Sequence, residues 1–206
     1  MVKRRALPLV AALVTVIILF ASSIVWFYYQ LPPHSLPSEP ADFYAISKEV
    51  SLSELIDIVE RQNRTVYLPS ELPEGFELTA IYVREDEFLA IIVYSVEDNK
   101  DYKTAELTIE ISPSLQTPTL DELKSWAEDS EHEKALEING WPVWVNEKAY
   151  IGVEERREKY GKEYAPLVIV WIKGHRYMIG SPVLTVEELI QLVRSMKSLS
   201  NFSLIF

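Results

Sequence analysis

The sequence predicts an α+β domain of antiparallel strands and helices that follows one N-terminal transmembrane helix. Three observations lead to this fold class. A run of 24 residues near the N-terminus carries no charge. Beyond it, short apolar or alternating segments are separated by turn residues, which is the pattern of antiparallel strands. Three Ser/Thr-x-x-Glu capping boxes, which open helices, stand among those segments at Ser51, Thr119 and Thr185.

The uncharged run, Ala6–Tyr29, is long enough to be the transmembrane helix. At ~1.5 Å per residue it would measure about 36 Å, and a hydrocarbon core is ~30 Å thick. Its last four residues are aromatic, Trp26–Tyr29, and such rings favour the membrane–water interface. The basic run Lys3–Arg5 predicts a cytoplasmic N-terminus, so the rest of the chain is expected outside the cell membrane. The alternative is a signal peptide cleaved after the small residues Ala21–Ser23, but the apolar run continues beyond them, which favours an uncleaved anchor.

Composition divides the 206 residues into three parts and excludes several kinds of chemistry. Residues 1–30 are a cytoplasmic stub and signal anchor, 31–40 are a stalk with four prolines in ten residues, and 41–206 are the extracytoplasmic domain. The net charge is −11 and no acid lies in the first thirty residues, so the exported part is strongly acidic and nucleic acid is not an expected partner. Cysteine is absent, which excludes disulfides and thiolate metal sites.

The first half of the domain predicts one helix and a meander of three antiparallel strands. The helix begins at the Ser51 capping box and ends near Asn63, and a Leu-Pro-Glu-Gly turn then leads into the strands. The second of these strands is almost wholly apolar, which suits a strand buried on both faces, and the third alternates. The strands are expected at about Glu77–Arg84, Phe88–Val96 and Ala105–Ile111.

The second half predicts two hairpins between two helices. Asn139-Gly140 is the preferred pair for a type I′ turn, so the strands on either side of it should form a hairpin. Pro142 confines the second of these strands to an edge or a bulge, because proline has no N–H. The charged stretch Lys148–Pro166 is expected as a surface excursion. The remaining elements are a helix from Thr119 to about Ser130, the strands Lys134–Ile138, Trp141–Val145, Leu167–Ile172 and Arg176–Gly180, and a last helix opened by Thr185.

Several of these segments together resemble a known family. They are Leu72–Phe76, Ile138–Gly140, the hairpin of Val168–Trp171 and His175–Gly180, and Leu184–Ile190. Over about Tyr67–Ser198 the chain is similar to the uncharacterised extracytoplasmic domains that accompany bacterial anti-sigma-factor and sporulation membrane proteins. Those domains are grouped distantly with periplasmic lipoprotein carriers. The resemblance implies a curved antiparallel sheet with helices packed on one face, and it implies no catalytic residue.

The residues predict no catalytic, cofactor-binding or metal-binding site. The three histidines, His34, His132 and His175, do not form the paired-histidine pattern of a helical zinc site. Neither a phosphate-binding glycine loop nor a nucleophile elbow is present. Acidic residues are abundant, but at this density they are normally a solvated surface, so the expected protein is not an enzyme.

Aromatic residues are the candidate contacts for a ligand or partner. Trp141 and Trp144 differ in parity on one strand, so they should lie on opposite faces of the sheet. One of the two rings is therefore expected to point away from the main core. Either a helix or the 148–166 excursion covers that ring, or the ring forms the edge of a binding groove. The candidates are Tyr94, Trp141, Trp144 and Trp171.

These observations predict a membrane-anchored, extracytoplasmic binding or sensor domain that is not catalytic. Its expected partners are the membrane, through the single-pass anchor, and another membrane or extracellular protein or an apolar ligand. The first alternative is an accessory subunit of a larger membrane protein complex. The second is a hydrolase with an unrecognised carboxylate site. The sequence contains few Asn and Gln and many Glu, which is a thermophile-like bias in composition.

Overall fold

The computed structural model describes residues 43–200. The chain divides into two units, Met1–Ser38 and Glu39–Phe206, and every described residue lies in the second. The expected transmembrane helix, the proline-rich stalk and the tail after Ser200 lie outside the described residues. Within residues 43–200, no helix combines the length and apolarity needed to cross a bilayer.

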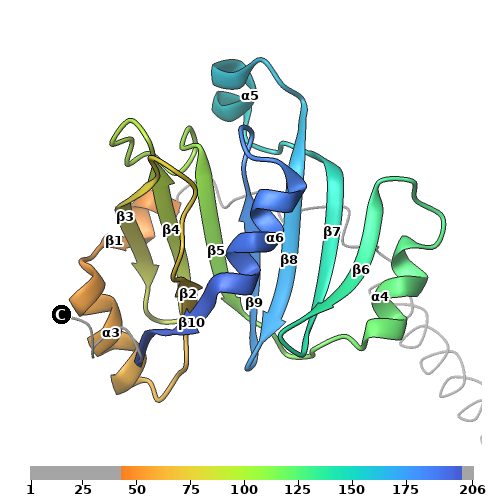
Figure 1. The fold of residues 1–206 in the computed structure, drawn as a ribbon. Coiled ribbons are helices and arrows are strands. Elements are labelled where there is room, and N and C mark those ends of the chain that lie inside the picture. The colour runs from red at the N-terminus through yellow and green to blue at the C-terminus, as the bar shows by residue number, and fades with distance from the viewer. Residues whose placement is uncertain (1–42, 201–206) are drawn as a thin grey trace, which may run out of the picture. The chain divides into compact units, whose positions relative to one another are not determined.

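The described residues contain an eight-stranded sheet in the order β1-β3-β4-β5-β9-β8-β7-β6 (Figure 1). Every neighbouring pair in it is antiparallel, which confirms the predicted α+β class with an antiparallel sheet. The strands are β1 (Lys48–Glu49), β3 (Glu77–Arg84), β4 (Leu89–Ser95), β5 (Leu107–Pro113), β6 (Glu133–Ile138), β7 (Trp141–Tyr150), β8 (Tyr164–Ile172) and β9 (His175–Gly180). A separate two-stranded sheet pairs β2 (Tyr67–Pro69) with β10 (Met196–Ser198).

The predicted meander and hairpins are present. β3, β4 and β5 are neighbours in sequence and in the sheet. Asn139 and Gly140 join β6 to β7 with φ values of 55° and 77°, the left-handed conformations that a type I′ turn requires. Pro142 does not lie on an edge strand, because β7 is flanked by β6 and β8. Instead the β7–β8 pairing begins only at Val143, so the sheet needs no N–H from the proline on that side.

One face of the sheet, here called the front face, carries the larger core. Helices α3 (Leu52–Arg61) and α6 (Val186–Ser195) pack there, and Leu55, Leu189 and Val193 are fully buried against the strands (Figure 1). All three predicted capping boxes are formed, at the starts of α3, α4 (Leu120–Ala127) and α6.

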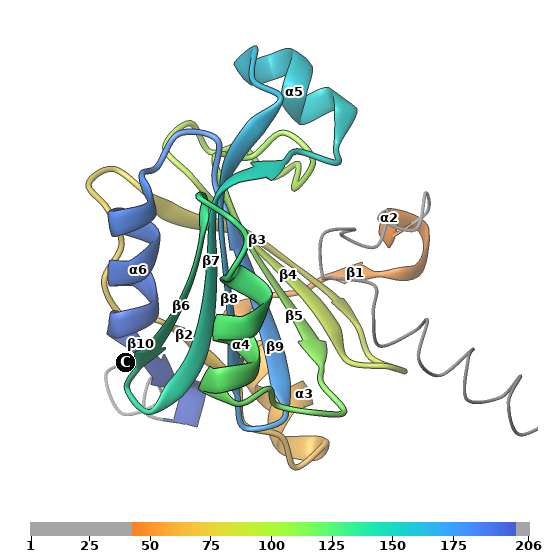
Figure 2. The same cartoon turned by 90° about the vertical axis from the view of Figure 1, so that its right-hand side faces the viewer.

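Helices cover the other face as well, here called the back face, which corrects the expectation of helices on one face only. Val143, Val145, Val168 and Val170 belong to the front core, so the residues between them point backwards. Helix α4 packs on β6 and β7 from that side, and Figure 2 shows α4 and α6 on opposite sides of the sheet. The physical reason is that central strands such as β4 and β8 are apolar on both faces, so both need cover.

The other end of the back face is closed by a second core. Phe43, in the short helix α2 (Phe43–Ile46), packs edge-to-face on Tyr102, with ring centroids 5.6 Å apart, and both are buried. The expected excursion at 148–166 contains the ends of β7 and β8 and helix α5 (Glu154–Tyr160). Arg156 and Tyr160 of α5 donate hydrogen bonds to backbone carbonyls of the 102–104 loop, so the excursion fixes that loop.

Candidate functional site

The four aromatic candidates do not meet in one groove. Tyr94 lies in the front core with 3% of its surface exposed, and the half-buried Trp141 packs on Tyr67 at the same face. Trp144 and Trp171 point to the back face and are 2% and 7% exposed. Trp141 and Trp144 therefore lie on opposite faces, as their parity predicts.

Helix α4 brings a further aromatic residue to the back face. Trp126 lies edge-to-face on Trp171 with ring centroids 6.4 Å apart, and 39% of its own surface is exposed. Sequence reasoning did not select it. Its position on the polar-looking helix after Thr119 gave no indication that it would lie on a strand residue some forty-five positions away.

Three acidic side chains are held within the domain, each by a different partner. Oε1 of Glu106 lies 3.9 Å from Nζ of Lys159, and Oε1 of Glu110 lies 4.0 Å from Nη2 of Arg176. Oε1 of Glu133 accepts a hydrogen bond from Nδ2 of Asn146. Burial raises the pKa of Glu110, and the charge of Arg176 acts against this shift. Within residues 43–200, no three His, Asp or Glu side chains lie close enough together to hold a metal ion.

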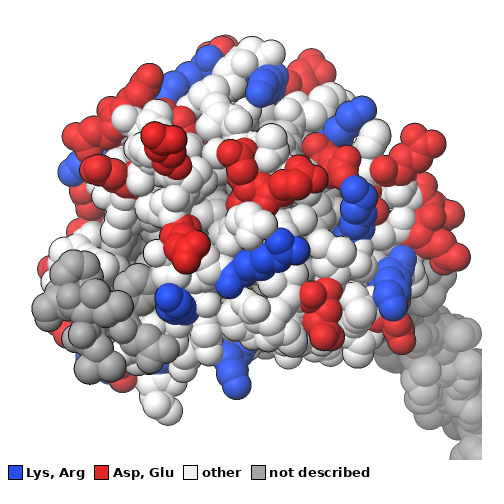
Figure 3. All heavy atoms as spheres, in the orientation of Figure 1, with Lys and Arg blue, Asp and Glu red and all other residues white. Residues whose placement is uncertain are grey.

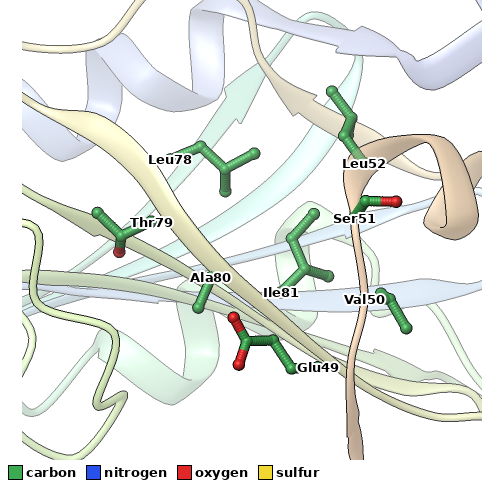
Figure 4. A pocket seen from close by; sticks show the side chains of 8 residues that line it. All are labelled: Glu49, Val50, Ser51, Leu52, Leu78, Thr79, Ala80 and Ile81. Atoms are coloured by element: carbon green, nitrogen blue, oxygen red, sulfur yellow. The ribbon is translucent and has the colours of Figure 1, made fainter.

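A hollow of about 520 Å³ lies at the outer edge of the sheet, where β1 ends beside β3. Figure 4 shows the segment after Glu49 and strand β3 diverging, with Leu52 and Leu78 on the two walls. The lining residues are Glu49, Val50, Ser51, Leu52, Leu78, Thr79, Ala80 and Ile81.

The capping box of α3 produces this hollow. Strand β1 pairs only with Tyr82 and Val83, and one further hydrogen bond runs from Val50 N–H to the Ile81 carbonyl at 2.9 Å. At Ser51 the chain turns into α3, because Ser51 N–H donates to Oε2 of Glu54 (2.7 Å) while Ser51 Oγ accepts from the Glu54 N–H (3.3 Å). The outer strand therefore stops after two residues, although β3 continues.

The part of β3 that β1 leaves uncovered is Glu77–Ala80. Among the described residues no strand pairs with it on the outer side. On the inner side the register with β4 shifts between Leu78 and Ala80. Thr79 lies at this β-bulge, and its Oγ1 donates a hydrogen bond to the Asn99 carbonyl at 2.8 Å. This bond ties the bulge to the loop that follows β4.

Apolar and acidic side chains are both exposed around the hollow. Leu78 is 37% exposed and Val96, which directly follows β4, is 51% exposed. The segments that form or flank the hollow, 48–54, 77–81 and 97–101, together carry six Asp and Glu against two Lys. Figure 3 shows acidic side chains gathered over the upper ends of β3 and β4.

Comparisons of the chain with protein-family models, with curated proteins and with solved structures give no match.

Proposed function

We propose that the chain is a membrane-anchored extracytoplasmic interaction domain that binds another protein and is not catalytic. One observation carries the proposal: an exposed apolar side chain, Leu78, borders a hollow at a sheet edge whose outer strand stops early. Among the described residues no strand pairs with the outer side of Glu77–Ala80, so the backbone groups of this edge and the exposed side chain of Leu78 are available to a partner.

The anchor and topology are part of the proposal. The uncharged run 6–29 would hold the domain at the membrane, and the basic residues before it would remain in the cytoplasm. In this position the chain would resemble the extracytoplasmic domains that accompany anti-sigma-factor and sporulation membrane proteins.

Crosslinking in membranes tests the proposal. A photoreactive phenylalanine analogue replaces Leu78 in the full chain, and a matched control replaces Val183, which is exposed to 46% against 37% for Leu78. Val183 lies between β9 and α6 and does not line the hollow. We expect one discrete crosslinked protein from position 78 and none from 183. Identical patterns at both positions, or no product at either, would contradict the proposal.

The anchor is tested separately by the intact mass of chain extracted from membranes. We expect a chain that retains residues 1–30. A product beginning near Ile24 would show a cleaved signal peptide, and the domain would then be secreted.

A further inference from the structure

We infer that the Glu77–Ala80 edge of β3 binds an extended partner segment as an added strand, in which apolar residues alternate with Lys or Arg. This inference rests on the proposed function and specifies the kind of protein segment that the domain takes. It follows from the edge geometry, from the two faces of the hollow and from charge.

The edge provides backbone groups for strand addition. Four residues of β3, about 13 Å of strand at ~3.3 Å per residue, extend past the last β1 hydrogen bond at Ile81. A strand placed in line with β1 would pair with this length and fill the space from which the chain turns away at Ser51. Peptides that extend a sheet gain affinity from main-chain hydrogen bonds and specificity from the side chains of alternate residues.

The two faces of the hollow differ in chemistry, so they would select alternating side chains. Successive residues of an added strand point to opposite faces. On the front side they would meet Leu52 and Leu78, which are apolar. On the back side they would meet Ala80, Glu49 and Glu77, since Glu49 pairs with Tyr82 of the back core and Glu77 pairs with Ser95 on the face of Val93. Glu49 also forms an exposed ion pair with Lys100 at 3.2 Å, for which a basic residue of the partner would compete. The front positions therefore favour Val, Leu or Ile, and the back positions favour Lys or Arg.

Charge decides between a partner and the other occupants that could pair with this edge. The acidic excess around the hollow attracts a basic segment and repels an acidic one. A second copy of the domain would bring the same acidic residues face to face. The tail Asn201–Phe206 is apolar but contains no Lys or Arg. The basic partner segment is the occupant that complements both the apolar and the acidic walls.

A synthetic peptide tests the inference on the full chain in nanodiscs of neutral phosphatidylcholine. The probe is a fluorescein-labelled, capped Lys-Val-Lys-Val-Lys-Val peptide, and the first control replaces every Lys by Glu. Two further analogues carry N-methyl groups on either the Lys or the Val residues, which removes N–H donors along one edge of the peptide without changing its charge. Binding is followed by anisotropy, and contact by hydrogen exchange of the amides at 77–81.

We expect the basic peptide to bind and the acidic peptide not to bind. One N-methylated analogue should lose about tenfold or more in affinity while the other binds normally, because only one edge of an added strand faces β3. Leu78→Lys and, as a second variant at an exposed site, Glu77→Lys should each weaken binding about tenfold. Val183→Lys, with the same change of charge as Leu78→Lys, should leave binding unchanged.

Other outcomes overturn the inference. Equal binding of both N-methylated analogues would mean adsorption to an acidic surface without strand pairing. Self-association that Leu78→Lys abolishes would identify a second copy as the occupant, and binding seen only after deletion of residues 201–206 would identify the tail. If the peptide fails while the crosslink from position 78 persists, the proposed function stands and only the strand inference is wrong.

Discussion

Nη1 of Arg64 lies 3.2 Å from Nε2 of His175, although 111 positions separate the two residues in the chain. Arginine can only donate, so Nε2 must accept and the imidazole must be neutral. The ring also packs edge-to-face on Phe88, with centroids 5.5 Å apart, and the Arg64 guanidinium lies over the face of Phe88 at 5.0 Å. This group connects the end of α3 to β4 and β9.

Acid should weaken the fold through His175. Burial is the largest cause that lowers the pKa of His175 below its ordinary 6.5, and the charge of Arg64 lowers it further. The unfolded chain therefore takes up a proton at a pH where the folded chain does not, so stability is lost as pH falls below 6.5 and until it reaches the folded pKa. Urea unfolding at about pH 7.5 and about pH 5.5 measures the loss. The His175→Gln variant should lose less between these two pH values than the unaltered chain, and an equal loss would contradict the assignment.

Replacing Trp144 should lower the free energy of unfolding of the domain. Its side chain is 2% exposed on the back face, so Trp144→Ala should cost about 3–5 kcal/mol in the free energy of unfolding. Trp171→Ala should also be destabilising. Trp126→Ala is the matched comparison, because this ring is 39% exposed, and we expect a much smaller loss. Urea denaturation compares the three variants, and a Trp144→Ala variant as stable as the unaltered chain would show that this ring is not a core residue.

A side chain at Gly140, the second residue of the Asn139-Gly140 turn, should lower the stability of the domain. Gly140 has φ of 77°, and a Cβ there would meet no atom within 4 Å, so the cost of Gly140→Ala is one of backbone strain alone. We expect a loss of about 1–2 kcal/mol. Gly152→Ala is the control, since Gly152 is equally uncrowded and its φ lies outside the left-handed range. Thermal unfolding of the two variants measures the difference, and equal melting temperatures would contradict a strained turn.

The capping box of α6 should contribute measurably to stability. Thr185 Oγ1 accepts from the Glu188 N–H, and Glu188 Oε2 accepts from the Thr185 N–H at 2.7 Å. Thr185→Ala removes the first of these bonds, and we expect a loss of ~1 kcal/mol. Thr117→Ala changes an exposed threonine outside any helix or strand and should have no effect. If chemical denaturation finds the two variants alike, the cap does not stabilise the helix in this protein.

The sequence by itself determined the elements whose cause is local. A capping box joins residues three apart, and a type I′ turn depends on two adjacent residues, so Ser51, Thr119, Thr185 and Asn139-Gly140 could be predicted and are confirmed. The same holds for strand alternation, which places Trp141 and Trp144 on opposite faces whatever the neighbouring strands are.

Only the tertiary structure decided which surfaces are covered and which remain open. Helix α4 packs on the back face of β6 and β7, where Leu123 is fully buried and Trp126 lies against Trp171 of β8. These contacts join segments that are far apart in the sequence. The hollow exists because β1 pairs with β3 across more than thirty positions and leaves it at Ser51. The order of the strands and the number of residues over which two strands pair depend on packing across the whole sheet. A short stretch of sequence does not contain that information.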